Sequence, residues 1–171
     1  MRLVPETAER HTLSILVDNE AGILARVAGM FSSRGYNIES LTVADVSRDN
    51  TISRISIVTS GSAHVIEQII AQLDRLVPVH KVTDLTAHGP HVERELALVK
   101  VAGTGEHRIE AIRLADIYRA RVLDATTGSF VFEITGSTDK IDTFVDLMRE
   151  VGLVEVARTG VVAIARGREA V

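Results

Sequence analysis

The stretch Asp18–Leu24 is the part of this sequence best suited to hold a small ligand. It follows a pattern typical of a strand and opens a pattern typical of a helix. The first backbone N–H groups of a helix have no internal partner, and the helix dipole favours an anion there. Gly22 would let a ligand approach the backbone closely, and Asn19 offers both a donor and an acceptor. With Ile23 and Leu24 as an apolar wall, the site would suit an α-carboxylate bearing a short aliphatic side chain; the alternative is a plain helix cap.

Other groups with possible chemistry form no recognisable catalytic site. His88 and His91 flank a Gly-Pro pair but lack a third metal ligand at a sensible spacing, so we expect solvated histidines and no metal. The loop Gly103–Gly105 lacks the other residues of a dinucleotide or phosphate loop, which favours a simple turn between a strand and a helix. The remaining candidates are carboxylates on the polar faces of expected helices, which we interpret as solvated: Glu67, Asp74, Glu110 and Asp116.

The ligand-binding turn lies within a regular succession of expected elements. Apolar residues alternate in the expected strands and recur at i, i+3, i+4 and i+7 in the expected helices. Ser62 is a suitable N-cap, and Gly35 and Pro78 are suitable helix ends. The first half is expected to contain a strand over 11–17, a helix carrying residues 24–31, strands over 37–46 and 51–59, a helix from 62, and a strand over 79–87.

The same order of elements recurs in the second half. It predicts a strand over 95–102, a helix carrying Ile109, Ile112, Leu114 and Ile117, a hairpin of 121–125 and 130–135, a helix from 138, and a strand over 154–165 bent at Gly160. The fold class is therefore α+β, with two tandem ferredoxin-like βαββαβ domains. We expect an N-terminal extension over 1–10, a first domain over 11–87, a linker over 88–93 and a second domain over 94–171.

Composition narrows the class of protein. The 171 residues carry a net charge of −4 without a basic cluster, which disfavours nucleic acid as a partner. There is no cysteine, and therefore neither a disulfide nor a thiolate site. No apolar run is long enough to cross a membrane, and the charged N-terminus is no secretion signal. We expect a cytoplasmic protein whose two units pack together or which dimerises, because units of this size are marginal alone and open sheets leave edge strands.

Several strings resemble a known family. The turn Asp18–Gly22 with the Leu-Ala-Arg-Val that follows resembles the start of an ACT domain, a ferredoxin-like module that binds amino acids between two copies. The string Arg34–Val43 resembles the signature of the small regulatory subunits of acetolactate synthase, also called acetohydroxyacid synthase. The resemblance extends over 11–167, with further matches at 91–96, 98–101 and 160–167. The sequence differs from the family pattern at Thr127–Gly128, where the family often has proline, and in its leading ten residues, which the shortest members lack.

The resemblance implies a homodimer whose ACT domains join side by side, with valine bound between them. The chain would have no catalytic activity; it would activate a catalytic large subunit of branched-chain amino acid biosynthesis and confer feedback inhibition by valine. Thiamine diphosphate, magnesium and FAD would bind to that subunit and none of them to this chain. One chain would contribute its turn to the valine site and its partner the entrance of the second strand; carried over by motif, these residues are Asn19, Ala21, Gly22, Ile23 and Leu24, with Asn37 and Ile38.

Three alternatives to this hypothesis find less support in the sequence. A tandem ACT-domain sensor of another pathway, such as glycine metabolism, would share the fold, but the string Tyr36–Ser40 argues against it. A stand-alone enzyme on this fold would need a cluster of titratable residues, which we do not find. A transcription factor would need a helix-turn-helix or a basic arm, and neither is apparent.

Overall fold

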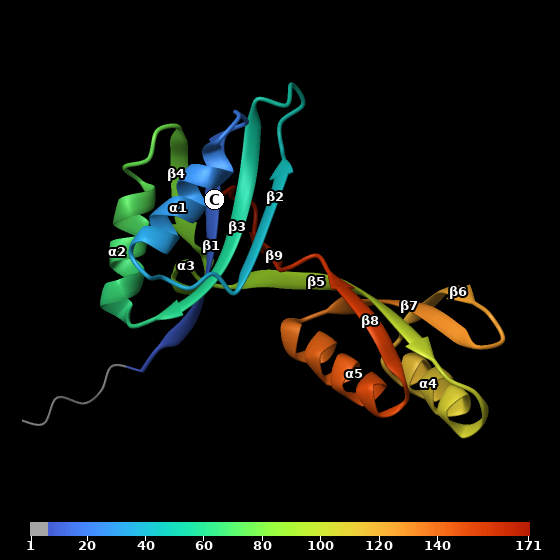
Figure 1. Ribbon diagram of the computed structural model, residues 1–171. Helices are drawn as coiled ribbons and strands as arrows, with labels where there is room; N and C mark the ends of the chain where they lie inside the picture. The colour runs from blue at the N-terminus through green and yellow to red at the C-terminus, as the bar shows by residue number, and fades with distance from the viewer. Residues whose placement is uncertain (1–6) are drawn as a thin grey trace, which may run out of the picture. The chain divides into compact units, whose positions relative to one another are not determined.

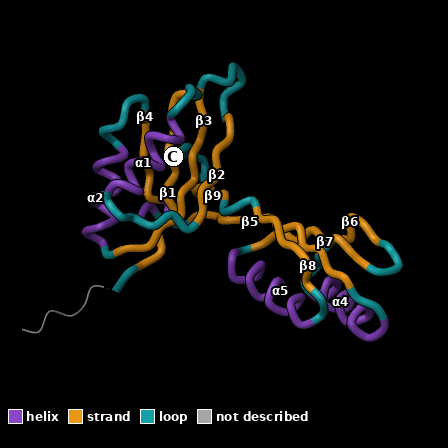
Figure 2. The backbone as a smooth tube through the Cα atoms, viewed as in Figure 1, coloured by secondary structure: helices purple, strands orange, loops and turns teal. Residues whose placement is uncertain are grey.

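The computed structural model describes residues 7–171 and divides into two compact units. The first unit extends to Val92 and includes Val161–Val171, whereas the second comprises Glu93–Gly160. In each unit, two long helices cover one face of a four-stranded antiparallel sheet (Figures 1 and 2). The predicted pair of ferredoxin-like βαββαβ units is confirmed.

The first sheet has the strand order β2-β3-β1-β4, so β2 and β4 are its edges. Expected and observed boundaries agree to within a few residues for most of this unit. The second helix begins after Ser62, whose hydroxyl accepts a hydrogen bond from the Val65 N–H, as predicted. The elements of this unit are β1 (Glu9–Asp18), α1 (Ile23–Ser33), β2 (Ser40–Asp45), β3 (Ile52–Gly61), α2 (Ala63–Leu73), β4 (Val79–Asp84), the short α3 (Leu85–His88) and β9 (Val162–Ala165).

The two faces of the first sheet differ because side chains alternate along each strand. Leu13 and Ile15 of β1 point into a core that also contains Phe31 of α1 and Ile69 of α2. The opposite face bears small and polar side chains, among them the buried Ser14. The first core is therefore almost entirely aliphatic, in keeping with the low aromatic content of the sequence.

The second sheet repeats the arrangement with the strand order β6-β7-β5-β8, and β9 also pairs with β5. Its core gathers three phenylalanines, and the rings of Phe130 and Phe132 stack at 5.3 Å between centroids. The elements of this unit are β5 (His91–Ala102), α4 (Gly105–Ile117), β6 (Arg121–Ala125), β7 (Ser129–Gly136), α5 (Thr138–Glu150) and β8 (Leu153–Arg158).

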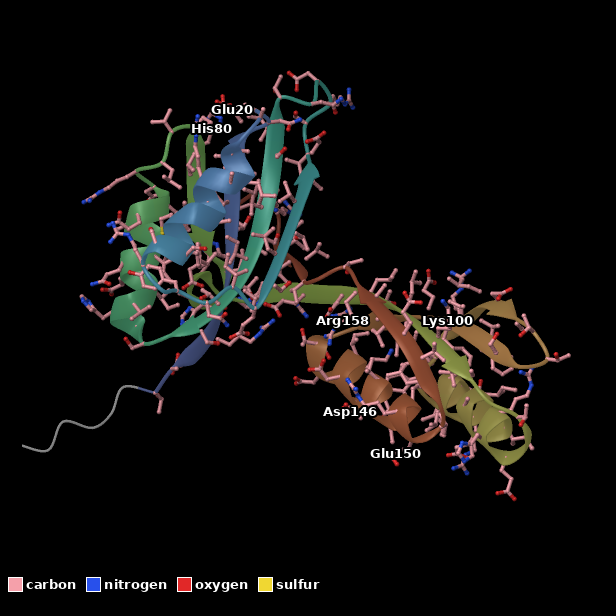
Figure 3. All side chains as sticks on the ribbon, in the orientation of Figure 1. Glu20, His80, Lys100, Asp146, Glu150 and Arg158 are labelled. Atoms are coloured by element: carbon pink, nitrogen blue, oxygen red, sulfur yellow. The ribbon has the colours of Figure 1, made fainter. Side chains whose placement is uncertain are left out.

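A charged network fastens β8 to β5 and α5 in the second unit. Arg158, which is labelled in Figure 3, donates two hydrogen bonds to the buried carboxylate of Glu95. These bonds are 2.6 and 2.8 Å long, and a third goes to Asp142 at 2.6 Å. The bonds to Glu95 raise the pKa of Arg158 above its ordinary value. Removal of Arg158 or of Glu95 would leave the other member of this pair partly buried without its counter-charge.

The predicted buried stripe of α4 is wrong in three of its four positions. Leu114 is buried, but Ile109, Ile112 and Ile117 are exposed by 46–68%. The helix instead buries its small residues against the sheet, because the rings of the core already fill the space beneath it. The residues of this helix that face the core are spaced i, i+3, i+4 and i+7: Ala111, Leu114, Ala115 and Tyr118.

Domain boundaries also differ from the expectation. Residues 1–6 of the expected extension lie outside the described part of the chain, but Glu9 and Arg10 already pair with β3. The end of the expected fourth strand is the short helix α3, capped by the Asp84 carboxylate. The expected linker shrinks to Gly89–Pro90 because β5 begins at His91.

The expected last strand over 154–165 is two strands, β8 and β9, separated near Gly160. Gly160 has a φ of +83°, a backbone conformation that ends the strand and favours glycine. The residues after it cluster with the first unit, where Ala163 and Val171 pack on Leu85. The second unit therefore ends at residue 160, and 161–171 belong to the first. Among residues 7–171, no helix is long and apolar enough to cross a membrane.

Candidate ligand-binding site

The turn between β1 and α1 is a defined backbone structure held by the β2–β3 hairpin. The Asn19 N–H donates to the Thr51 carbonyl at 2.7 Å, and the Asn19 side-chain amide donates to the Asn50 carbonyl at 2.9 Å. In turn, Thr51 donates its hydroxyl hydrogen to the Asp49 carboxylate at 2.8 Å. Hydrogen bonds from Thr51 and Ser47 keep the pKa of Asp49 below its ordinary value. One donor of Asn19 is therefore committed to structure.

The N-terminus of α1 is open at Gly22. Gly22 is the N-cap, with a φ of +90°, and no side chain caps this helix, in contrast to α2. A Cβ placed on Gly22 would meet no atom within 4 Å, so the space beside the backbone is empty. The first regular helical bond runs from the Arg26 N–H to the Gly22 carbonyl at 3.0 Å. The Ile23 N–H donates to the Glu20 carbonyl at 3.4 Å, whereas the N–H groups of Leu24 and Ala25 have no backbone partner among the described residues. These two groups and the helix dipole favour an anion.

Charged side chains around the turn are already engaged. Arg26 donates to Glu20 at 3.1 Å and to the Val77 carbonyl at 2.8 Å. His80 of β4 contacts the Asp18 carboxylate at 2.5 Å. Figure 3 labels Glu20 and His80 at this end of the first sheet. These contacts hold the turn in place, and no local motif predicts those to Val77 and His80, because both residues come from a distant segment of the chain.

The apolar wall expected at this site is smaller than predicted. Ile23 is only 5% exposed because its side chain packs in the core, so this side chain cannot form part of the wall. Leu24 is 42% exposed and is the larger apolar side chain available beside the turn. Ala21 is also exposed and adds a small apolar surface. The apolar surface beside the turn therefore consists of Leu24 and Ala21.

The second group of expected ligand residues lies at the other end of the sheet. Asn37 is exposed and its carbonyl accepts a hydrogen bond from the Thr59 hydroxyl at 2.7 Å. Ile38 is half-buried against the core. Thr59 pairs with His11 near the start of β1, whereas the turn follows the end of β1.

A single chain therefore does not bring the two groups together. The turn is anchored beside Ile52 and the entrance beside Thr59, seven residues apart along β3. At about 3.3 Å per residue, this separation is about 23 Å. A site that uses both groups needs a second copy of the chain.

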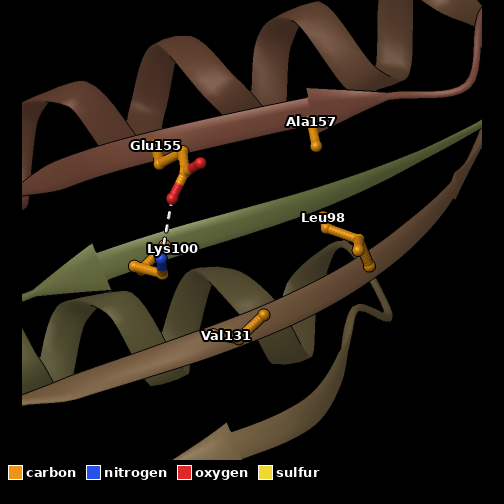
Figure 4. A pocket seen from close by; sticks show the side chains of 5 residues that line it. All are labelled: Leu98, Lys100, Val131, Glu155 and Ala157. Atoms are coloured by element: carbon orange, nitrogen blue, oxygen red, sulfur yellow. Dashed lines mark hydrogen bonds and ion pairs between the residues drawn. The ribbon is translucent and has the colours of Figure 1, made fainter.

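A second hollow lies on the helix-free face of the second sheet. It has a volume of about 290 Å³ and is lined by Leu98, Lys100, Val131, Glu155 and Ala157 (Figure 4). Lys100 donates to Glu155 at 2.7 Å, and this bond and the charge of Lys100 lower the pKa of Glu155. The hollow is shallow and its two charges satisfy each other, so it offers little to a charged ligand.

The other candidates from the sequence remain apart. His88 ends α3, and the His91 ring contacts the Gly89 carbonyl at 3.1 Å. In the described part of the chain, no three histidines or carboxylates gather closely enough to hold a metal ion. The loop Gly103–Gly105 is the turn before α4, as predicted. Glu110 pairs with Arg113 on the same helix.

Two family models match this chain and together cover most of it. The model described as an AHAS small subunit-like ACT domain matches residues 13–81. The model described as the small subunit of acetolactate synthase matches residues 94–167. The first match lies within the first unit, whereas the second match spans the second unit and continues into the segment that returns to the first.

Similar proteins carry consistent descriptions. A probable acetolactate synthase small subunit of Archaeoglobus fulgidus is 48% identical over 94% of this chain and 99% of its own length. The acetolactate synthase isozyme 3 small subunit of Escherichia coli is 47% identical over 92% of this chain and 96% of its own. The crystal structure of the acetolactate synthase small subunit from Thermotoga maritima has a TM-score of 0.83 and 38% identity, covering 94% of this chain and 99% of that one.

Proposed function

The chain belongs to the family of acetolactate synthase small subunits, and we propose that it is a dimeric valine sensor that activates a catalytic large subunit and makes it subject to feedback inhibition. Membership of this family makes it a regulatory subunit in branched-chain amino acid biosynthesis. The alternative, a sensor for another pathway such as glycine metabolism, has no support among these relatives.

The open N-terminus of α1 is the observation that carries the choice of ligand. Valine presents a carboxylate, an ammonium group and a short branched side chain. The N–H groups of Leu24 and Ala25 suit the carboxylate, and the exposed part of Leu24 suits the side chain. The ammonium group needs acceptors, for which the side-chain oxygens of Asn19 and of Asn37 from the second copy are suitable.

The register of the first sheet supports a site shared between two copies. Strand β2 is an edge strand that runs from Ser40, near Asn37, to Asp45, near the turn. If two β2 strands pair antiparallel around a two-fold axis, the Asn37 end of each lies beside the turn end of the other. Such pairing would also cover an exposed sheet edge. It would create two equivalent valine sites, each with a turn from one chain and an entrance from its partner.

Regulation then follows from linkage. A ligand that touches both chains senses their relative position, and it shifts the complex toward whichever state it binds more tightly. Coupling of this kind is typically about 1–3 kcal/mol, enough to change activity by about one to two orders of magnitude. We propose that the unliganded dimer stabilises the active state of the catalytic subunit and that valine withdraws this effect.

The chemistry of the reaction belongs to the catalytic subunit in this proposal. Thiamine diphosphate, magnesium and FAD would be bound there, and this chain would bind none of them. We propose that both subunits act in the cytoplasm, without nucleic acid or membrane as a partner.

A panel of thermal melts tests the choice of ligand. The purified chain would be melted with each standard amino acid in turn. A ligand at about a hundred times its dissociation constant adds about 2.7 kcal/mol to the stability of the state it binds. We expect a higher midpoint with valine and little change with glycine or charged amino acids.

Reconstitution with the catalytic subunit tests the regulatory role. The expected result is higher acetolactate formation on addition of this chain, and a return toward the basal rate with valine. A midpoint raised by glycine alone, or a reconstituted activity that ignores valine, would contradict the proposal.

A further inference from the structure

The segment Val161–Val171 lies on the helix-free face of the first sheet and is fastened at both ends. The Val161 N–H donates to the Ser40 hydroxyl at 2.7 Å, and the Thr42 hydroxyl donates to the Val161 carbonyl at 3.3 Å. At the other end, the Arg54 guanidinium donates to the Val171 carbonyl oxygen at 3.2 Å. Both backbone groups of Val161 are thus held by side chains of β2.

These side chains share one face of the sheet. Ser40 pairs with Val58, and Thr42 pairs with Ser56. Ile57, which lies between Val58 and Ser56 on β3, points to the opposite face and into the core. Ser40 and Thr42 therefore point away from the helices and toward the returning segment.

Val161 occupies a special place in the chain. It is the first residue that rejoins the first unit after the second one ends at Gly160. It is also only 3% exposed, so its position is fixed by packing as well as by hydrogen bonds. A displacement of the Ser40 end of β2 would therefore act on the point where the chain leaves the second unit.

Ser40 follows directly on the segment proposed to bind valine. The Asn37 carbonyl is held by the Thr59 hydroxyl at 2.7 Å, and the Glu39 N–H donates to the Val58 carbonyl at 2.9 Å. The segment from Asn37 to Ser40 is thus tied to β3 by hydrogen bonds that restrict its movement.

On this geometry we infer that Ser40, assisted by Thr42, is a positioning residue that links valine binding at Asn37–Ile38 to the chain crossing at Gly160–Val161. The inference rests on the proposed function. Valine would act on the entrance of β2, and the two hydroxyl groups would pass its displacement to the backbone of Val161. Ser40 need not touch the ligand, so its role concerns the response to valine and not the affinity for it.

The test separates affinity from response. Ser40→Ala removes the acceptor of the Val161 N–H, and Ser40→Thr restores a hydroxyl at the same place. Ser14→Ala is the matched control, because Ser14 is a buried serine on the same face whose hydroxyl has no hydrogen-bond partner among the described residues. For each variant, valine affinity is measured by calorimetry on the isolated dimer, and valine inhibition is measured on the complex with the catalytic subunit.

We expect Ser40→Ala to bind valine with the affinity of the wild type. Because one hydrogen bond is lost, its inhibition at saturating valine should fall by about two- to ten-fold. Amide exchange at Val161 should be faster in this variant, whereas Ser40→Thr and Ser14→Ala should behave as the wild type. If Ser40→Ala does not fold, Thr42→Val carries the same expectation, since it keeps the shape and removes the donor.

Full valine inhibition in Ser40→Ala, or in its substitute Thr42→Val, would overturn the inference while leaving the proposed function intact. A loss of valine affinity equal to the loss of inhibition would also overturn it, because it would make Ser40 part of the binding site. A wild-type complex that ignores valine would overturn both.

Discussion

Gly22→Asp is expected to abolish most valine binding, and Gly22→Asn provides the matched comparison. Both side chains have nearly the same size, and both residue types tolerate the positive φ found here. A Cβ at this position meets no atom within 4 Å, so neither variant clashes with the folded chain. The two variants should therefore lose similar stability and differ only in charge.

The difference in charge can be given a magnitude. A carboxylate at position 22 would lie about 4 Å from a ligand carboxylate at the helix N-terminus, and two like charges at that distance repel by about 4 kcal/mol at an effective dielectric constant of about 20. Gly22 is exposed, so solvent screening reduces this repulsion to about 2 kcal/mol. That value corresponds to a further loss of affinity of about 30-fold for Asp compared with Asn.

Calorimetric titration of valine into each dimer measures this difference. Increasing the salt concentration should narrow the gap between the two variants, because the repulsion is screened. Equal affinity of Gly22→Asp and Gly22→Asn would refute the electrostatic argument. Wild-type affinity in both variants would remove the turn from the site altogether.

Other substitutions test the remaining parts of the account. Asn37→Ala should weaken valine inhibition without lowering the melting temperature, since the residue is exposed. Unchanged inhibition would show that Asn37 does not contribute to the valine site. Arg158→Ala should lower the free energy of unfolding by about 2 kcal/mol in a denaturant titration, a value between those for exposed and buried ion pairs. An unchanged free energy of unfolding would show that Glu95 is well solvated in the absence of Arg158. Leu114→Ala should cost about 2–4 kcal/mol, but Ile109→Ala on the same helix less than about 0.5 kcal/mol; equal costs would place both side chains in the core.

The sequence predicted the fold well because hydrophobic spacing and turn residues agreed along most of the chain. It failed on α4, where Ile109 and Leu114 look equally suited to the core. Hydrophobicity alone favoured the isoleucines, whereas the packing space left by Phe130 and Phe132 favoured alanines. Such a choice depends on the partners across the core, which a local pattern does not contain.

The end of the chain was misjudged for a similar reason. Val154–Ala165 reads as one strand, and the glycine within it was taken for a bend. The segment after Gly160 instead finds hydroxyl groups of β2, more than a hundred residues earlier in the chain. Long-range hydrogen bonds of this kind decide where a strand ends and leave no local signal.

The candidate site was predictable in part. The residue types predict a turn before α1 with an accessible backbone at Gly22, and the structure shows that Gly22 is the N-cap of a helix without a side-chain cap. The buried side chain of Ile23 was not, because a residue at the start of a helix can point either way until the helix is docked. The position of Asn37 at the far end of the sheet gains meaning only with a second copy of the chain.

Mixed dimers test the shared site most directly. A Gly22→Asp chain and an Asn37→Ala chain with different affinity tags would be produced together, and the heterodimer would be purified through both tags. Neither homodimer should bind valine with wild-type affinity. In the heterodimer, one site carries both substitutions and the other carries neither.

The account predicts one valine of wild-type affinity per heterodimer. If each site lay within one chain, both sites of the heterodimer would be damaged, and the titration would show no tight binding. That result would contradict the central claim that the turn of one chain and the β2 entrance of its partner form the valine site together.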